Sequence, residues 1–209
     1  MKFIESSLLE RTTRQKHTWR YVTAAIVVVI LLCGSLIAWG AVQQPSLLGR
    51  YASHSVRNFG VVWPGKLDRS GKPYSSAGWQ WMHDQGIRSI VTLLKPEKDK
   101  VDYSKFGFEK VLRIGLEGQE VPTDEQTKEY LAFVQDPKAW PVDVHCSEGK
   151  DRTGMMIALA RYAIDGWSLD QALAEAKRYR GDDLARFRIE WLKKWAATHP
   201  PGSEGKPSS

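Results

Sequence analysis

The clearest chemical pattern in the sequence is a cysteine followed, after five intervening residues, by an arginine. The segment reads HCSEGKDRTG from His145 to Gly154 and contains Cys146 and Arg152. An apolar strand that ends at His145, a short glycine-containing loop and a helix that begins near Thr153 would aim backbone N–H groups at one point. Such a cradle binds a phosphate dianion, and its positive field lowers the pKa of a cysteine at its base. The segment therefore predicts a thiolate beside a phosphate site.

The side chains of this loop have the types that phosphoryl transfer needs. We expect Cys146 to be the nucleophile and Arg152 to hold two phosphoryl oxygens with its forked guanidinium. Gly149 permits a tight turn that a side chain would crowd, and the Thr153 hydroxyl can donate to the thiolate. The predicted phosphate cradle consists of Ser147, Glu148, Gly149 and Lys150. Together these groups predict phosphoryl transfer through a cysteinyl-phosphate intermediate.

Other interpretations of the same residues fit less well. A cysteine after an apolar strand is more often a buried core thiol, but that role requires none of the Arg, Thr and Gly that follow. A Walker A loop is excluded, because Asp151 follows Gly149 and Lys150. The one other cysteine, Cys33, lies in an apolar run, so no disulfide is expected. No metal and no cofactor are expected either.

The segment resembles the C-x5-R signature loop of the protein tyrosine phosphatase superfamily. Its GKDRTG form is similar to that of bacterial tyrosine/phosphoinositide phosphatases and of atypical dual-specificity phosphatases. Further segments that resemble the atypical group are RSGKP (69–73), GWQWM (78–82), GIRSIVTL (86–93) and IGLEG (114–118). The resemblance covers about residues 60–165. It implies that Cys146 is the nucleophile, that Arg152 clamps the phosphate, and that the chain hydrolyses phosphomonoesters.

The general acid is the part of this chemistry that the resemblance leaves open. Many members of the superfamily carry an aspartate on a mobile loop upstream of the signature, but residues 115–122 contain only Glu117 and Glu120 as acids. Either glutamate could protonate the leaving oxygen. Asp151 could instead act from inside the loop, and we favour it because its position beside Arg152 is fixed. The structural alternatives are solvated loop glutamates, and an Asp151 that pairs with a nearby cation.

The elements around the loop predict an α/β domain with a twisted, largely parallel sheet flanked by helices. Short apolar or β-branched runs predict strands at 61–63, 88–94, 108–114 and 141–145. Helices are predicted at 76–85, 123–134, 153–165, 168–180 and 184–199. Thr123 and Gln126 have the spacing of a capping box at the start of the second of these helices.

An uncharged apolar segment, residues 21–42, precedes the predicted domain. A helix of this length would be about 33 Å long, enough to cross a bilayer core of roughly 30 Å. Basic residues within 1–20 predict a cytoplasmic N-terminus and a periplasmic or otherwise extracytoplasmic catalytic domain; a cleaved signal peptide is the alternative. We then expect a linker at 43–58, the catalytic domain at 59–199 and a disordered tail at 200–209.

The charge balance limits the class of partner. The net charge of +6 suits an anionic substrate, but the sequence lacks the dense Lys/Arg stripes of a nucleic-acid-binding protein. The expected partners are a phosphorylated protein, an inositol phosphate or a phospholipid, and the membrane through the N-terminal helix. A catalytically weak phosphate-binding or scaffold module on the same fold is the alternative, and only the missing loop aspartate favours it.

Overall fold

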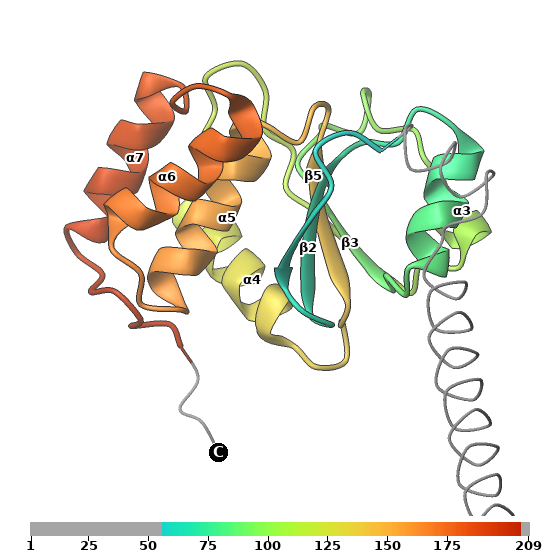
Figure 1. Cartoon of the computed structure of the whole chain (residues 1–209), viewed down its shortest axis with the longest axis horizontal. Coiled ribbons are helices and arrows are strands. Elements are labelled where there is room, and N and C mark those ends of the chain that lie inside the picture. The colour runs from blue at the N-terminus through green and yellow to red at the C-terminus, as the bar shows by residue number, and fades with distance from the viewer. Residues whose placement is uncertain (1–55, 206–209) are drawn as a thin grey trace, which may run out of the picture. The chain divides into compact units, whose positions relative to one another are not determined.

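The computed structural model describes residues 56–205. In this part of the chain five strands form one sheet, in the order β1-β2-β5-β3-β4 (Figure 1). The strands are β1 (Gly60–Trp63), β2 (Leu67–Gly71), β3 (Ser89–Thr92), β4 (Lys110–Arg113) and β5 (Val142–Cys146). Every neighbouring pair is parallel except β1 and β2. The predicted largely parallel sheet is confirmed.

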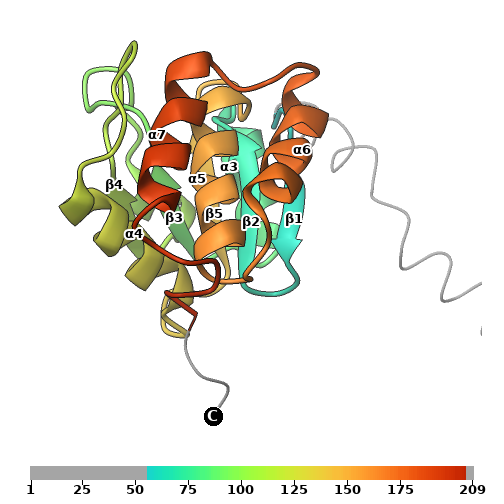
Figure 2. The same cartoon turned by 90° about the vertical axis from the view of Figure 1, so that its left-hand side faces the viewer.

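Helices cover both faces of this sheet (Figures 1 and 2). One face carries α3 (Ser76–Asp84) and the 3-10 helix η1 (Tyr103–Phe106). The other carries α4 (Asp124–Gln135), α5 (Asp151–Ala163), α6 (Leu169–Arg180) and α7 (Arg186–Ala196). The larger hydrophobic core lies under α4 to α7, and the smaller core lies under α3 and η1. Helix α5 is buried along most of its length, because α6 and α7 pack on the side that faces away from the sheet.

Local signals in the sequence explain where several helices begin and end. Thr123 and Gln126 form both bonds of the predicted capping box at the start of α4. Ser168 and Gln171 form the same reciprocal bonds before α6. Helix α6 is followed directly by Gly181, which has a φ of +84° and therefore takes the left-handed conformation that glycine adopts without strain. These helices lie within a few residues of their predicted bounds.

Three elements differ from the prediction: β2 and the 3-10 helix η1 were not predicted, and α5 begins earlier than expected. Strand β2 was not predicted, because its sequence LDRSG has neither an apolar run nor a regular alternation. It is a strand because it lies between β1 and β5, with Leu67 opposite Val142 and Gly71 opposite Cys146. Helix α5 begins at Asp151 and not near Thr153, so Arg152 belongs to its first turn.

The predicted ends of the catalytic domain also need correction. The Gly202 N–H donates to the Tyr162 carbonyl and the Glu204 N–H donates to the Ala163 carbonyl, each at 2.9 Å. Residues 200–205 therefore fold back on the end of α5 and are not a disordered tail, whereas the rest of the predicted tail, 206–209, lies outside the described residues. At the other end, Val56 is buried in the smaller core, so the packed chain begins before residue 59. The predicted membrane helix, 21–42, lies outside the described residues.

Residues 56–205 contain no helix that is long and apolar enough to cross a bilayer.

Candidate active site

The signature loop has the predicted strand, loop and helix geometry. Strand β5 ends at Cys146 and α5 begins at Asp151, so residues 147–150 form the loop between them. The Cys146 side chain is buried at the base of this loop, and the Gly149 N–H donates to its Sγ atom at 3.3 Å. The loop therefore presents backbone amides to the sulfur, as an anion cradle requires.

Opposing effects set the pKa of the Cys146 thiol. Burial raises the pKa, but hydrogen bonds from the Thr153 hydroxyl and amide, the charge of Arg152 and the Glu148 amide lower it, and the balance lies below the ordinary value. The single hydroxyl proton of Thr153 has a second acceptor, the Ser70 carbonyl, at 3.4 Å. That distance is long for an O–H···O bond, so the sulfur is the better acceptor once it is ionised.

Arg152 is positioned at the rim of the cradle by two loops. Its Nη1 atom donates to the Leu116 carbonyl at 2.8 Å and lies 3.4 Å from the Leu93 carbonyl. These carbonyls follow β4 and β3, so the carboxyl ends of two neighbouring strands hold the guanidinium. A guanidinium has five N–H donors, and the remaining ones are available to an anion.

A buried arginine supports the loop from beneath. Arg69, in β2, is 0% exposed. Its Nη2 atom donates to the Gly149 carbonyl, and its guanidinium carbon lies 3.7 Å from the centre of the Tyr179 ring. The sequence does not predict this contact, because the LDRSG segment lacks the pattern of a strand. The RSGKP segment was the only signal that marked Arg69.

Cys146 faces a cavity of about 520 Å³ that is rich in basic side chains. The basic residues that line it are Lys98, Lys150, Arg152, Arg180 and Arg188. Three acidic residues, Glu117, Glu148 and Asp151, also line it, and each forms an ion pair with a basic residue. No local pattern in the sequence marks Lys98, Arg180 or Arg188, because only the folded chain brings them next to the signature loop.

Arg188 is the most deeply buried of these lining cations. It comes from α7, is 2% exposed, and burial lowers its pKa. Its Nε atom lies 3.2 Å from a carboxylate oxygen of Asp151, and its Nη2 atom lies 3.4 Å from the Gly118 carbonyl. Its Nη1 atom has no hydrogen-bond partner within residues 56–205. A buried, unpartnered donor beside the cavity is suited to an incoming anion.

The Asp151 carboxylate is held by contacts with the end of α6 and with α7 and the residue before it. One oxygen accepts from the Ala185 N–H at 2.9 Å, and it lies 3.6 Å from Arg180 Nε. The other oxygen pairs with Arg188. These contacts support the structural alternative, in which Asp151 is the partner of nearby cations.

Both candidate glutamates of the upstream loop are paired with lysines. Glu117 pairs with Lys98, and Glu120 pairs with Lys95 at 2.8 Å. The hydrogen bond from each lysine is the main reason that the pKa of each glutamate is lowered. Of the two, only Glu117 lines the Cys146 cavity. A carboxyl group that ionises more readily than usual is less suited to donate a proton near neutral pH.

His145 stabilises the other side of the cradle. Its Nε2 atom lies 3.0 Å from the Tyr103 hydroxyl, which donates to Asp99 at 2.7 Å. Burial lowers the pKa of His145 to about 4, so the ring is neutral at pH 7. The side chain packs next to the nucleophile without adding charge.

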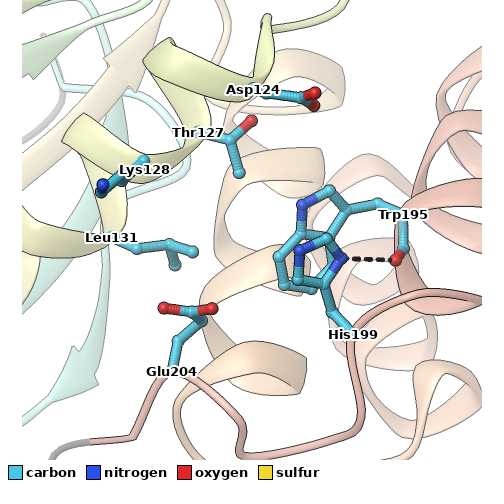
Figure 3. Close-up of a pocket in the computed structure, with 7 residues that line it drawn as sticks. All are labelled: Asp124, Thr127, Lys128, Leu131, Trp195, His199 and Glu204. Atoms are coloured by element: carbon cyan, nitrogen blue, oxygen red, sulfur yellow. Dashed lines mark hydrogen bonds between the residues drawn. The ribbon is translucent and has the colours of Figure 1, made fainter.

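A second cavity, of about 310 Å³, lies between α4, the end of α7 and Glu204 (Figure 3). Trp195 and His199 stack on one side of it, with ring centres 4.0 Å apart. Its one hydroxyl, that of Thr127, donates to the Thr123 carbonyl at 2.8 Å. Its lining contains no cluster of cations and no thiol. The Cys146 cavity is therefore the candidate active site.

Comparison with known proteins supports this assignment. Residues 66–192 match the family model described as DSP-PTPase phosphatase fused to NAD+ kinase. A putative tyrosine-protein phosphatase, OCA1 of Debaryomyces hansenii, is 26% identical over 61% of this chain and 69% of its own length. The inositol diphosphatase DSP4 of Arabidopsis thaliana is 30% identical over 58% of this chain and 63% of its own length.

A third relative has a solved structure. The inositol diphosphatase SIW14 of Saccharomyces cerevisiae is 28% identical over 55% of this chain, and the match spans 43% of SIW14. The crystal structure of its core catalytic domain, in complex with citrate, has a TM-score of 0.57 and 23% identity, and covers 68% of this chain and 92% of that domain. The shared fold is that of the cysteine phosphatases. The chain thus belongs to the DSP-PTPase family of atypical dual-specificity phosphatases, within the protein tyrosine phosphatase superfamily, and is a phosphoric monoester hydrolase.

Proposed function

We propose that this chain removes a phosphate from a small, highly phosphorylated substrate of the inositol phosphate or inositol diphosphate class. The observation that carries the proposal is the set of five basic side chains around one cavity. A phosphotyrosine presents a single dianion, whereas a polyphosphorylated ring presents several around its edge. The five basic side chains outnumber the three acidic ones and come from separate segments of the chain, so phosphates at more than one position on a ring can each meet a cation. Two of the relatives, SIW14 and DSP4, are named inositol diphosphatases.

The proposed reaction has two chemical steps. The Cys146 thiolate attacks phosphorus, so an S–P bond forms while the bond to the leaving oxygen breaks and that oxygen takes the electron pair. Arg152 donates to two of the non-bridging oxygens, and the loop amides stabilise their charge. A water then attacks phosphorus, the S–P bond breaks, and inorganic phosphate leaves. The thiolate returns to the hydrogen bonds from Gly149 and Thr153.

The proposed substrate class also bears on the missing loop aspartate. When a diphosphate is cleaved, the leaving group is itself a phosphate, which is a much weaker base than an alkoxide. Such a group departs with less help from a general acid. The ion pairs of Asp151, Glu117 and Glu120 are compatible with a site that does not depend on a strong proton donor.

The substrate class is tested by removing Arg188. We expect Arg188→Gln to lower kcat/KM for an inositol diphosphate by about 10- to 100-fold, because one charged hydrogen bond to a substrate phosphate contributes about 1.5–3 kcal/mol. Turnover of an aryl phosphate, which has one phosphate, should change less than about threefold. The measurement is steady-state kinetics on an inositol diphosphate, an inositol hexakisphosphate, a phosphotyrosine peptide and a phospholipid.

Arg186→Gln is the matched control for this prediction. It removes the same charge from the same helix, but the Arg186 side chain is 93% exposed and pairs with Glu190. Thermal unfolding of both variants would show whether either is misfolded. A wild-type preference for the phosphotyrosine peptide, together with an equal loss on all substrates in Arg188→Gln, would contradict the proposed substrate class.

The role of Asp151 is tested by varying the leaving group. We expect Asp151→Asn to reduce kcat/KM for alkyl and activated aryl phosphates by the same factor, about tenfold, because loss of the carboxylate charge shifts the first turn of α5, which also carries the phosphate clamp Arg152. A true general acid would instead produce a loss that is about 10²- to 10⁴-fold and confined largely to the alkyl phosphate. Comparison of the two substrate types in wild type and variant separates these outcomes. Selective loss on the alkyl phosphate would make Asp151 the acid.

A further inference from the structure

Two residues that precede β1, Arg57 and Asn58, contact the outer side of the signature loop. The Asn58 side-chain amide donates to the Glu148 carbonyl at 2.8 Å. The Arg57 Nη1 atom lies 2.6 Å from the Glu148 carboxylate, and the Arg57 carbonyl accepts from the Gly71 N–H at 2.7 Å. The two residues therefore contact the carbonyl and the carboxylate of one cradle residue. The family match begins at residue 66, so both lie before the matched region.

The contact from Asn58 determines the direction of a catalytic amide. The Glu148 carbonyl and the Gly149 N–H belong to one peptide unit, which is planar, so in its trans form the two groups point in opposite directions. The Gly149 N–H is the amide that donates to Cys146 Sγ at 3.3 Å. A donor that holds the carbonyl on the outer side therefore keeps the N–H directed at the sulfur on the inner side.

The backbone at Asn58 has the conformation that this contact requires. Its φ of +51° lies in the left-handed region, and it is the one residue other than glycine in the described range with a positive φ. Asparagine tolerates this region better than most residues do. The chain therefore turns at Asn58 in a way that directs its side chain to the loop.

The contact from Arg57 offsets the negative charge of the Glu148 carboxylate. Glu148 lines the Cys146 cavity, where a free carboxylate would repel an anionic substrate. Its carboxylate is shared by Arg57 and by Lys150, whose Nζ atom lies 3.4 Å away. The Arg57 guanidinium carbon in turn lies 4.3 Å from the centre of the Tyr74 ring. This arrangement holds the positive charge next to the one acidic side chain of the cradle loop.

We propose that Arg57 and Asn58 are positioning residues of the active site that act through Glu148. Asn58 orients the peptide unit whose amide stabilises the Cys146 thiolate, and Arg57 offsets the Glu148 charge that the substrate meets. The inference rests on the proposed role of Cys146 as nucleophile. It makes the segment that enters the domain a part of the catalytic apparatus and not a passive linker.

The role of Asn58 is tested by Asn58→Gly in the full chain. Glycine accepts the positive φ without strain, so this variant removes the amide donor and leaves the turn. We expect the pKa of the Cys146 thiol, measured from the pH dependence of its alkylation by iodoacetamide, to rise by about one unit, the equivalent of one lost hydrogen bond. The acid limb of the kcat/KM profile should move by the same amount. A residue with only a structural role would lower the thermal unfolding temperature and leave the thiol pKa unchanged, which would overturn the inference.

The role of Arg57 is tested by a double-mutant cycle with Glu148. We expect Arg57→Ala to raise KM for an anionic substrate by about three- to tenfold with little change in kcat, and to have no such effect when Glu148→Gln has already removed the charge. Lys138→Ala is the matched control, because it removes one positive charge from an exposed residue before β5, at the far end of the strands. An equal rise in KM in both backgrounds would overturn the role of Arg57.

The outcomes of these tests can be distinguished from a failure of the proposed function. Alkylation reports on the Cys146 thiol whether or not a substrate has been identified. If Cys146→Ser retained wild-type turnover, the proposed function would fail, and the shift in thiol pKa in Asn58→Gly would still be measurable. If Cys146→Ser were inactive and Asn58→Gly left the thiol pKa unchanged, only the positioning role of Asn58 would fail.

Discussion

Replacement of Cys146 by serine is expected to reduce turnover by about 10³-fold or more, because a hydroxyl in this site is not ionised near neutral pH and is a far weaker nucleophile than a thiolate. The fold should persist, since serine is close to cysteine in size and the Gly149 N–H can donate to either side chain. Binding of inorganic phosphate should be largely retained, because the loop amides and Arg152 supply most of the contacts to the anion. The measurement is hydrolysis of an aryl phosphate, with calorimetry for phosphate binding.

Cys33→Ser is the matched control, because Cys33 is the only other cysteine in the chain. We expect it to retain full activity. Residual activity of Cys146→Ser within about tenfold of wild type, a difference of about 1.4 kcal/mol in the barrier, would be incompatible with a cysteinyl-phosphate mechanism. Trapping of a phosphorylated chain by rapid acid quench in wild type, and its absence in the variant, would provide independent evidence for the covalent step.

The signature loop could be predicted because its parts are contiguous in the chain. Nucleophile, cradle and clamp all lie within residues 146–152, and β5 and α5 on either side have strong local signals. The other two arginines of the cavity, Arg180 and Arg188, could not be predicted in the same way. Arg180 ends α6 and Arg188 belongs to α7, and they reach the site only because these helices pack beside α5. Their role depends on tertiary packing, which a local pattern does not contain.

Strand β2 shows why one element of the fold was missed. Its side chains are mostly polar, yet Arg69 and Ser70 are both 0% exposed. Each has a partner in or beneath the site: Arg69 bonds to Gly149, and the Ser70 hydroxyl donates to Asp143 at 2.9 Å. A strand whose buried side chains support a loop does not have the apolar pattern of an ordinary core strand. The polar side chains that support the site therefore remove the apolar pattern by which β2 could have been predicted.

The same reasoning applies to the N-terminal boundary of the domain. Residues 43–58 are predicted to be a linker, and a sequence pattern alone does not show that Arg57 and Asn58 contact Glu148. The hydrophobic signal at Val56 is a single residue, although it is buried in the smaller core. A boundary defined by hydrogen bonds to a loop about ninety residues away becomes visible only in the folded chain.

Replacement of Gly149 by alanine is expected to have the second largest effect. Gly149 has a φ of +70°, and a Cβ atom there would lie 2.5 Å from the Ser70 carbonyl carbon and would also collide with the Gly71 nitrogen. These are backbone atoms of β2, so no change of rotamer can relieve the overlap. The loop must move away from β2, which shifts the Gly149 N–H away from Cys146 and the Gly149 carbonyl away from Arg69. We expect kcat/KM to fall by about 10²-fold or more, as for a misplacement of about 1 Å, and stability to fall by about 2–4 kcal/mol.

Gly65→Ala separates this collision from simple backbone strain. Gly65 has a φ of +69°, almost the same as Gly149, but no atom lies within 4 Å of the position its Cβ would take. Alanine there carries only the conformational cost of about 1–2 kcal/mol, and activity should be unchanged. Urea unfolding gives the two stabilities, and aryl phosphate hydrolysis gives the two activities. Equal losses of stability in both variants, with no loss of activity in either, would contradict this prediction. The contact between the signature loop and β2 would then not be required for the active conformation of the cradle.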